Sequence, residues 1–231
     1  MFEISPAEWT AILLSLRVAI IATLVATPFG IALAWLLARY NFWGKSVLDA
    51  LVHLPLVLPP VVTGYLLLLT FGRRGLVGAW LADNLGIVFA FRWTGAALAC
   101  GVMSFPLLVR PIRLSIEAID RRLEQAASTL GAAPWRVFAT VTLPLALPGI
   151  LAGMVLGFAK AIGEFGATIT FVSNIPGETQ TISSAIYSLI QTPDGDTAAG
   201  RLVLISIVIA MSALIASEWF ARRATQRLHG N

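Results

Sequence analysis

Side chains that could carry out covalent or acid–base chemistry are scarce in this sequence and rarely stand close together. Asp, Glu, Lys and Arg make up 12% of the 231 residues, and there are one cysteine and two histidines. Cys100 has no second cysteine to pair with, and His53 lies far from His229 along the chain, so neither residue type predicts a metal site. No nucleophile stands at a recognisable spacing from a general base. We therefore expect neither catalytic residues nor metal ligands.

The sequence also lacks the glycine-rich loop that binds the phosphates of ATP. Gly44, Lys45 and Ser46 match the end of such a loop, but Arg39 occupies the position where its first glycine is needed. We expect this chain to hold no cofactor and to hydrolyse no ATP itself.

Two pairs of titratable side chains stand four residues apart inside otherwise apolar segments. Lys160 and Glu164 are spaced to form an ion pair along one helix face. Asp49 and His53 are the only pair that a secondary transporter could use to couple transport to an ion gradient. They keep a stand-alone secondary transporter open as an alternative class.

The composition explains why such groups are rare. Hydrophobic residues reach 58%, and the mean hydropathy is +0.84, whereas an ordinary globular domain carries about 25% charged residues. A chain this poor in charge is neither disordered nor a nucleic-acid-binding module, and it does not resemble most soluble enzymes. We expect an all-α membrane protein.

Long segments without charge predict the membrane spans. A spanning helix needs roughly 17–25 mainly apolar residues, and backbone groups in lipid must bond within the helix. These requirements predict five helices, near residues 12–38, 48–71, 94–113, 147–172 and 201–220. No Lys or Arg precedes Arg17, so the first apolar run lacks the basic start of a cleaved signal peptide and is expected to remain.

The basic residues indicate which side of the membrane each loop occupies. Cytoplasmic loops carry the excess of Lys and Arg. With five spans, one side holds Arg39, Lys45, Arg110, Arg113, Arg121, Arg122, Arg136, Arg222, Arg223 and Arg227. The other side holds Arg73, Arg74, Arg92 and Arg201. The N-terminus is therefore expected outside and the C-terminus in the cytoplasm.

Proline and glycine mark local departures from straight helices. Three prolines within residues 53–60 predict a kink in the second span. Gly149, Gly153 and Gly157, spaced by four, predict a close helix contact. In the external loop 173–200, the apolar spacing over 181–191 predicts a helix, with Ser183 as its cap and Pro193 at its end.

The cytoplasmic loop 116–146 carries the most specific pattern. A helical run ends at Gly131, which suits a positive-φ turn. Pro134 can begin a second short helix with Trp135 and Phe138 on one face, and Pro144 returns the chain to the membrane. This pattern fits either a loop folded on itself at the membrane surface or a helix-turn-helix knob that inserts into a groove on a soluble partner.

The loop resembles the EAA loop of ABC importer permeases. That motif has Glu-Ala-Ala, then Gly after three residues, then Ile-x-Leu-Pro after nine more. Here it reads Gln125-Ala126-Ala127, Gly131 and Val141-Thr142-Leu143-Pro144. Gln125 stands where the family has Glu, although Glu124 precedes it, and Val141 replaces Ile.

Further segments are similar to molybdate permeases. The similarity is clearest from Gly163 to Thr181, and it extends to residues 53–60, 72–75, 103–107 and 189–193. Sulfate permeases share Gly163-Glu164-Phe165-Gly166, so a sulfate or thiosulfate permease is the alternative within this class. The resemblance covers about Glu8 to Glu218.

The resemblance implies the type I importer permease fold, with residues 1–231 as a single transmembrane domain in the bacterial cytoplasmic membrane. It implies a homodimer, two copies of a cytoplasmic ATPase that bind ATP and Mg²⁺, and an external oxyanion-binding protein. The residues expected to couple to the ATPase are Glu124, Gln125, Ala126, Ala127, Gly131, Trp135 and Phe138.

A path for a dianion requires donors that bind it without trapping it. Buried cations would hold the anion too tightly, so neutral hydroxyl and amide groups are better suited. The candidates near kinked helices are Thr63, Ser104, Thr168, Thr170, Ser173 and Asn174. For each hydroxyl the alternative is a hydrogen bond back to its own helix.

Overall fold

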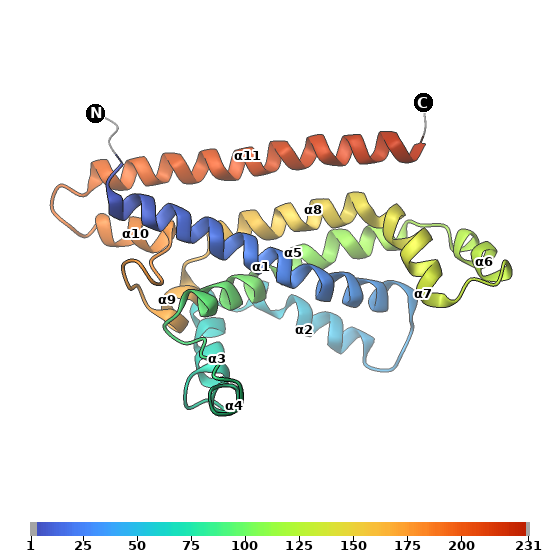
Figure 1. Cartoon of the computed structure of the whole chain (residues 1–231), viewed down its shortest axis with the longest axis horizontal. Coiled ribbons are helices and arrows are strands. Elements are labelled where there is room, and N and C mark those ends of the chain that lie inside the picture. The colour runs from blue at the N-terminus through green and yellow to red at the C-terminus, as the bar shows by residue number, and fades with distance from the viewer. Residues whose placement is uncertain (1–3, 230–231) are drawn as a thin grey trace.

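The computed structural model describes residues 4–229, and the side chains only as far as residue 216. Every regular element in that range is helical (Figure 1). The elements are α1 (Pro6–Arg39), α2 (Lys45–Val57), α3 (Pro60–Phe71), α4 (Leu76–Leu85), α5 (Trp93–Glu117), α6 (Arg121–Thr129), α7 (Pro134–Val137), a π-helical turn (Phe138–Thr142), α8 (Leu143–Ile162), α9 (Gly166–Val172), α10 (Ile182–Leu189) and α11 (Asp196–His229).

The long helices lie side by side along the molecule. α5 packs against α1 and α8, and α11 packs against α8 (Figure 1). The segments Pro6–Arg39, Trp93–Glu117, Pro134–Ile162 and Asp196–Ala216 are each long and apolar enough to cross a membrane, and α2 with α3 makes a fifth span if counted together. The prediction of an all-α membrane protein with about five spans is confirmed.

The second span is broken where the prolines predicted a kink. α2 and α3 meet at an angle of 115°. Pro59 precedes α3 and Pro60 occupies its first turn, where the missing N–H costs no helical hydrogen bond. α3 and α4 therefore project away from the long helices (Figure 1).

The fourth span differs from the continuous helix predicted over 147–172. The predicted range holds two helices, α8 and α9, separated at residues 163–165, and the apolar run long enough to span a membrane ends at Ile162. Glu164 is buried at the break, and its Oε1 accepts a hydrogen bond of 3.0 Å from the backbone N–H of Ala167 at the start of α9. Its Oε2 accepts from Lys160 Nζ at 2.6 Å, which confirms the predicted ion pair.

Small residues allow α5 and α8 to pack closely. A Cβ atom on Gly153 would lie 2.6 Å from the backbone oxygen of Leu108, and one on Gly149 would clash with Ser115. Both partners belong to α5. The predicted contact through the spaced glycines is therefore confirmed.

The loop 173–200, which is predicted to be external, folds against the N-terminal part of α1. The N-cap position of α10 is occupied by Thr181, without a side-chain capping bond, rather than by Ser183, whose Oγ donates to the backbone oxygen of Ile162 at 3.3 Å. The N–H of Ile182 donates to Ser15 Oγ of α1 at 2.7 Å. α10 ends at Leu189, before Pro193, because the chain already turns there, with the N–H of Thr192 donating to Leu189.

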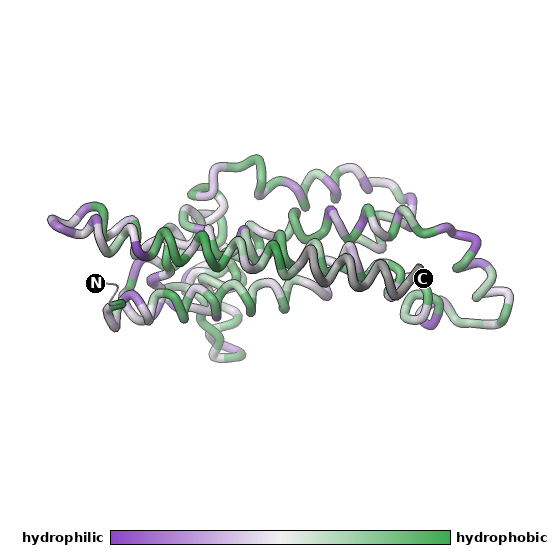
Figure 2. Tube along the Cα trace, turned by 90° about the horizontal axis from the view of Figure 1, so that it is seen from above, coloured by the Kyte–Doolittle hydropathy of each residue, from purple (hydrophilic) through white to green (hydrophobic). Residues whose placement is uncertain are grey.

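Hydrophilic residues gather toward the two ends of the molecule, and hydrophobic residues follow the middle of the long helices (Figure 2). α6 and the C-terminal end of α11 lie toward one end, and α10 lies toward the other (Figure 1). At this second end Arg201 Nη2 of α11 lies 2.9 Å from Glu8 Oε1 of α1. Three of the predicted cytoplasmic arginines, Arg222, Arg223 and Arg227, have side chains outside the described part of the chain.

Candidate functional site

Residues 118–142, which contain α6 and α7 and are called the α6 loop below, protrude at one end of the molecule (Figure 1). The Asp120 carboxylate caps α6 by accepting from the N–H of Arg122 at 2.9 Å. Gly131 follows the helix at φ = +83°, a conformation that side chains with a Cβ resist. Pro134 then occupies the first turn of α7. The two short helices joined at a glycine turn lie where the sequence predicts them.

The return of the loop to the membrane differs from the prediction. Pro144 does not end the excursion, because α7, the π-helical turn and α8 form one run of helix from Pro134 to Ile162. The backbone N–H of Leu143 donates to the oxygen of Phe138, five residues earlier. This wider turn precedes Pro144, which lies in the first turn of α8, where a missing N–H is tolerated. α7 and α8 are thus continuous along the chain, without an intervening loop.

Glu124 connects α6 to two other elements. Its Oε1 accepts from Arg39 Nε at 3.1 Å and lies 3.0 Å from Arg39 Nη2, at the end of α1. The same oxygen accepts from Thr142 Oγ1 at 2.7 Å, just before α8. These residues are 85 and 18 positions away from Glu124. The sequence showed only opposite charges on the same predicted side, which does not identify a pair.

The remaining predicted coupling residues divide between the surface and the interior. Gln125 and Ala126 are exposed, and Ala127 is half-buried. Trp135 is 67% exposed, whereas the half-buried Phe138 packs on Trp35 of α1 with ring centroids 5.3 Å apart. Phe138 therefore packs inside the molecule, whereas Trp135 faces outward and is available to a partner.

Two leucines of the same loop are also exposed, and we refer to Leu123, Leu130 and Trp135 together as the exposed tip. Leu123 is 51% exposed and Leu130 is 89% exposed. Exposed apolar side chains that lie close together often mark a surface that binds another protein. Behind the tip, a cavity of 540 Å³ lies between α6, α7 and the end of α1. An exposed apolar tip with space behind it suits insertion into a groove on another protein.

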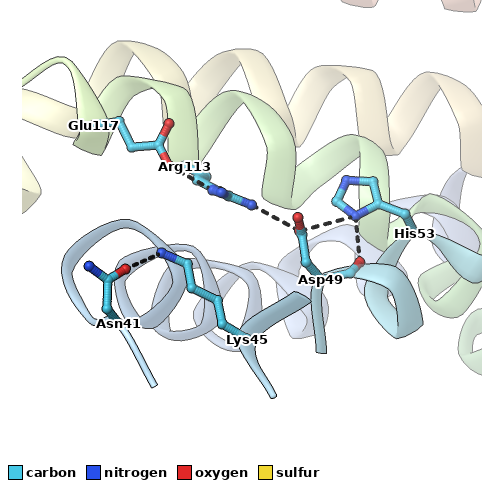
Figure 3. Close-up of polar contacts among 6 residues, drawn as sticks. All are labelled: Asn41, Lys45, Asp49, His53, Arg113 and Glu117. Atoms are coloured by element: carbon cyan, nitrogen blue, oxygen red, sulfur yellow. Dashed lines mark hydrogen bonds and ion pairs between the residues drawn. The ribbon is translucent and has the colours of Figure 1, made fainter. Parts of the chain in front are cut away.

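A second polar cluster ties α2 to α5 (Figure 3). Arg113 Nη1 lies 2.9 Å from Asp49 Oδ1, and Arg113 Nε donates to Glu117 Oε1 at 2.8 Å. His53 Nδ1 lies 2.8 Å from the backbone oxygen of Asp49 and 3.5 Å from its carboxylate. Of the pair that a secondary transporter would need, Asp49 is bonded to Arg113 of α5, and His53 is bonded to Asp49 within α2. Lys45 contacts Asn41 at 3.1 Å beside this cluster.

The six candidate path residues lie on α3, α5, α9 and the segment after α9. Three hydroxyls bond back to their own chain segment, as the alternative interpretation expects: Ser104 donates to Gly101, Thr168 to Phe165 and Thr170 to Gly166. Ser173 is exposed at φ = +65°. Asn174 Nδ2 donates to Ser188 Oγ at 2.7 Å.

Two buried atoms of this set have no partner among the described residues, Thr63 Oγ1 and Asn174 Oδ1. The structure brings α3 and α9 together at Gly64, where a Cβ would lie 2.5 Å from the oxygen of Ala167. Thr63 therefore lies at the contact between the kinked second span and the broken fourth span. A cavity of 670 Å³ elsewhere, between α1, α2 and α5, is almost wholly apolar and is lined by none of the six.

Residues 26–227 match the family described as "binding-protein-dependent transport system inner membrane component". The chain is 63% identical to the molybdenum transport system permease protein ModB of Escherichia coli K12, over 95% of this chain and 96% of that protein. It is 38% identical to a probable sulfate transport system permease protein of Chlorokybus atmophyticus, over 86% of this chain and 70% of that protein.

The fold is also found in a solved structure. A bacterial ABC transporter involved in the import of alginate superposes with a TM-score of 0.74 at 21% identity, covering 95% of this chain and 80% of that chain. At this identity the similarity establishes the fold, which is that of an ABC importer permease.

Proposed function

The chain belongs to the family of binding-protein-dependent transport system inner membrane components, and we propose that it is the membrane-spanning subunit of an ATP-driven importer of molybdate. It is a multi-pass protein of the bacterial inner membrane. The observation that supports molybdate as the substrate is the 63% identity to a molybdenum transport permease along almost the whole of both chains.

In this proposal the chain provides the path and a partner provides the energy. The relatives are transport permease subunits, and we assign no catalytic residue to this chain. ATP and Mg²⁺ are bound by a cytoplasmic ATPase on a separate chain. The full assembly contains two copies of this chain, two ATPase subunits and an external oxyanion-binding protein.

Coupling is assigned to the protruding α6 loop. The exposed residues Gln125, Ala126 and Trp135 contact the ATPase, and Gly131 fixes the turn between the two helices. Glu124, Ala127 and Phe138 lie on the inner side of this loop, so they support its shape. Closure of the ATPase subunits would displace α7, and the continuous helix would carry that displacement into α8.

The substrate path is assigned to the neutral donors near the two broken spans. Thr63, Ser104, Thr168, Thr170, Ser173 and Asn174 are neutral, so a molybdate dianion would be bound through hydrogen bonds and released again. Thr63 supports this assignment best, because its buried hydroxyl has no partner in the described structure.

The second candidate substrate is sulfate or thiosulfate. The 38% identity to a probable sulfate permease favours it over unrelated solutes. Molybdate and sulfate are both tetrahedral dianions, so the fold alone does not separate them.

The experiment that separates these substrates is uptake of labelled molybdate by cells with and without the chain, in the presence of excess sulfate. We expect deletion to abolish high-affinity molybdate uptake, and the chain supplied on a plasmid to restore it. An excess of sulfate of about a thousandfold should leave this uptake largely intact. Sulfate competition at equal concentration would instead identify a sulfate permease.

A further inference from the structure

α6 has little packing of its own to fix it in place. None of its residues is buried. Ser128 and Thr129 donate only to backbone oxygens within α6. Among the described residues, Glu124 is the one α6 side chain with a hydrogen bond or ion pair to another helix.

One carboxylate oxygen of Glu124 bonds both to the end of α1 and to the residue before α8. Arg39 Nε, Arg39 Nη2 and Thr142 Oγ1 all lie within 3.1 Å of Glu124 Oε1. Arg39 is the last residue of α1, and Thr142 directly precedes α8. Arg39 Nη2 also donates to the backbone oxygen of Ile119 at 3.4 Å, at the entry to the loop.

This contact is shielded from solvent. The side chains of Arg39 and Glu124 are 9% and 19% exposed, and Thr142 is 1% exposed. A charge-assisted hydrogen bond is shorter than a neutral one and roughly twice as strong. The alternative links between α6 and the rest of the chain are the short segments 118–120 and 130–133, the second of which contains the Gly131 turn.

We infer that Glu124 is a positioning residue, which makes α6 move together with α1 and α8 when the ATPase subunit pulls on the loop. This inference rests on the proposed function for the meaning of that movement. Glu124 acts through Arg39 and Thr142, and the exposed tip alone contacts the ATPase. Without the contact, α6 stays docked but turns about Gly131, and the spans receive less of its displacement.

The test uses the complete complex in lipid nanodiscs and proteoliposomes, with Cys100→Ala as the background. Spin labels at Ser128→Cys in α6 and Leu147→Cys in α8 report the distance between the two helices, independently of any substrate. We expect a narrow distance distribution that ATP does not broaden, and a broad one in Glu124→Gln and in Thr142→Val. Because Glu124→Gln keeps the size of the side chain, a change in packing volume does not explain that result.

The second readout is the number of molybdate ions transported per ATP hydrolysed. We expect Glu124→Gln to lower this ratio about fivefold or more, the lower bound of a typical coupling between sites, while the ATPase subunit stays bound. The exchange of charges in Arg39→Glu with Glu124→Arg should restore most of it. Glu117→Gln is the matched control, because that carboxylate ends α5, next to the loop, and among the described side chains it pairs only with Arg113 on its own helix.

Two results would overturn the positioning role. One is an unchanged distance distribution in Glu124→Gln. The other is loss of the ATPase subunit from Glu124→Gln, which would make Glu124 part of the docking surface itself. If the unaltered complex hydrolyses ATP but transports no molybdate, the proposed substrate is wrong, and the spin-label distances still decide the role of Glu124.

Discussion

At the scale of single residues, what distinguishes the candidate path groups is whether each has a free proton to donate. An anion needs hydrogen-bond donors. The hydroxyl protons of Ser104, Thr168 and Thr170 are already donated to backbone oxygens. Asn174 donates one of its two amide N–H groups to Ser188, and Ser173 is exposed, whereas Thr63 Oγ1 is a buried hydroxyl without any partner among the described residues. Thr63 is therefore the strongest donor candidate of the set.

We expect Thr63→Val to slow molybdate uptake more than the loss of any other hydroxyl in this set. Valine keeps the shape of threonine and removes one donor, and a lost hydrogen bond to a charged group is worth roughly 1.5–3 kcal/mol, or about tenfold to a hundredfold in uptake rate. Thr63→Ser should retain most activity. Thr170→Val is the matched control, because its hydroxyl is committed to Gly166; an equal loss in both variants would argue against Thr63.

The turn at Gly131 depends on backbone conformation rather than on space. A Cβ at this position would meet nothing within 4 Å, but φ is +83°. Gly131→Val should therefore strain the turn by about 1–3 kcal/mol and tilt α7 relative to α6. Gly131→Asn should be milder, since asparagine tolerates positive φ.

The measurement for these variants is transport per assembled complex rather than per cell. We expect Gly131→Val to insert into the membrane, because the spans are untouched, and to lose most transport per complex. Normal transport per complex in Gly131→Val would mean that the geometry of this turn does not matter for coupling.

At the scale of elements, α2 is weakly supported by packing within the chain. Val52 is its one buried residue, and the ion pair between Asp49 and Arg113 is its polar contact with α5 (Figure 3). The 115° bend separates it from α3. The ion pair is partly exposed, and such a pair typically contributes about 0.2–1 kcal/mol to holding α2 on α5.

We expect Asp49→Asn to loosen α2 without unfolding the protein. A cysteine placed at Val52, in a Cys100→Ala background, should react about twofold to fivefold faster with a thiol reagent in this variant, as the energy of such a pair implies. Glu117→Gln leaves the Asp49 contact in place and serves as the comparison. Equal labelling rates would show that the pair does not hold α2.

The spans could be predicted from sequence because their signal is local. A run of residues without charge is visible in any window of the chain, and three prolines close together mark a break. The break at residues 163–165 was missed, because it is stabilised by the burial of Glu164 and by its bond to the N–H of Ala167. α4 was also missed, because Arg73, Arg74 and Asp83 gave that region the composition of a loop.

The contacts of the candidate site could not be predicted from the sequence, because they join residues that only the fold brings together. Arg39 and Glu124 are 85 residues apart, and Asp49 and Arg113 are 64 apart. No periodicity relates such positions, so a sequence shows the charges but not their partners. The loop motif was recognisable because its glycine and prolines act on the backbone within a few residues.

At the scale of the whole molecule, the fold and the substrate rest on different observations. The fold is shared with an alginate importer at 21% identity, so it does not determine what is transported. The assignment of molybdate depends on the much closer sequence similarity. The N-outside orientation stays a prediction, supported by the grouping of Arg39, Lys45 and the α6 loop toward one end of the molecule.

The most direct test of the account is molybdate uptake by proteoliposomes that contain the purified chain with its ATPase, supplied with the loaded binding protein. The account predicts accumulation that needs enclosed ATP and the ATPase, and that continues when ionophores remove ion gradients. Uptake by the chain without the ATPase, abolished by an ionophore, would contradict it and identify a secondary transporter.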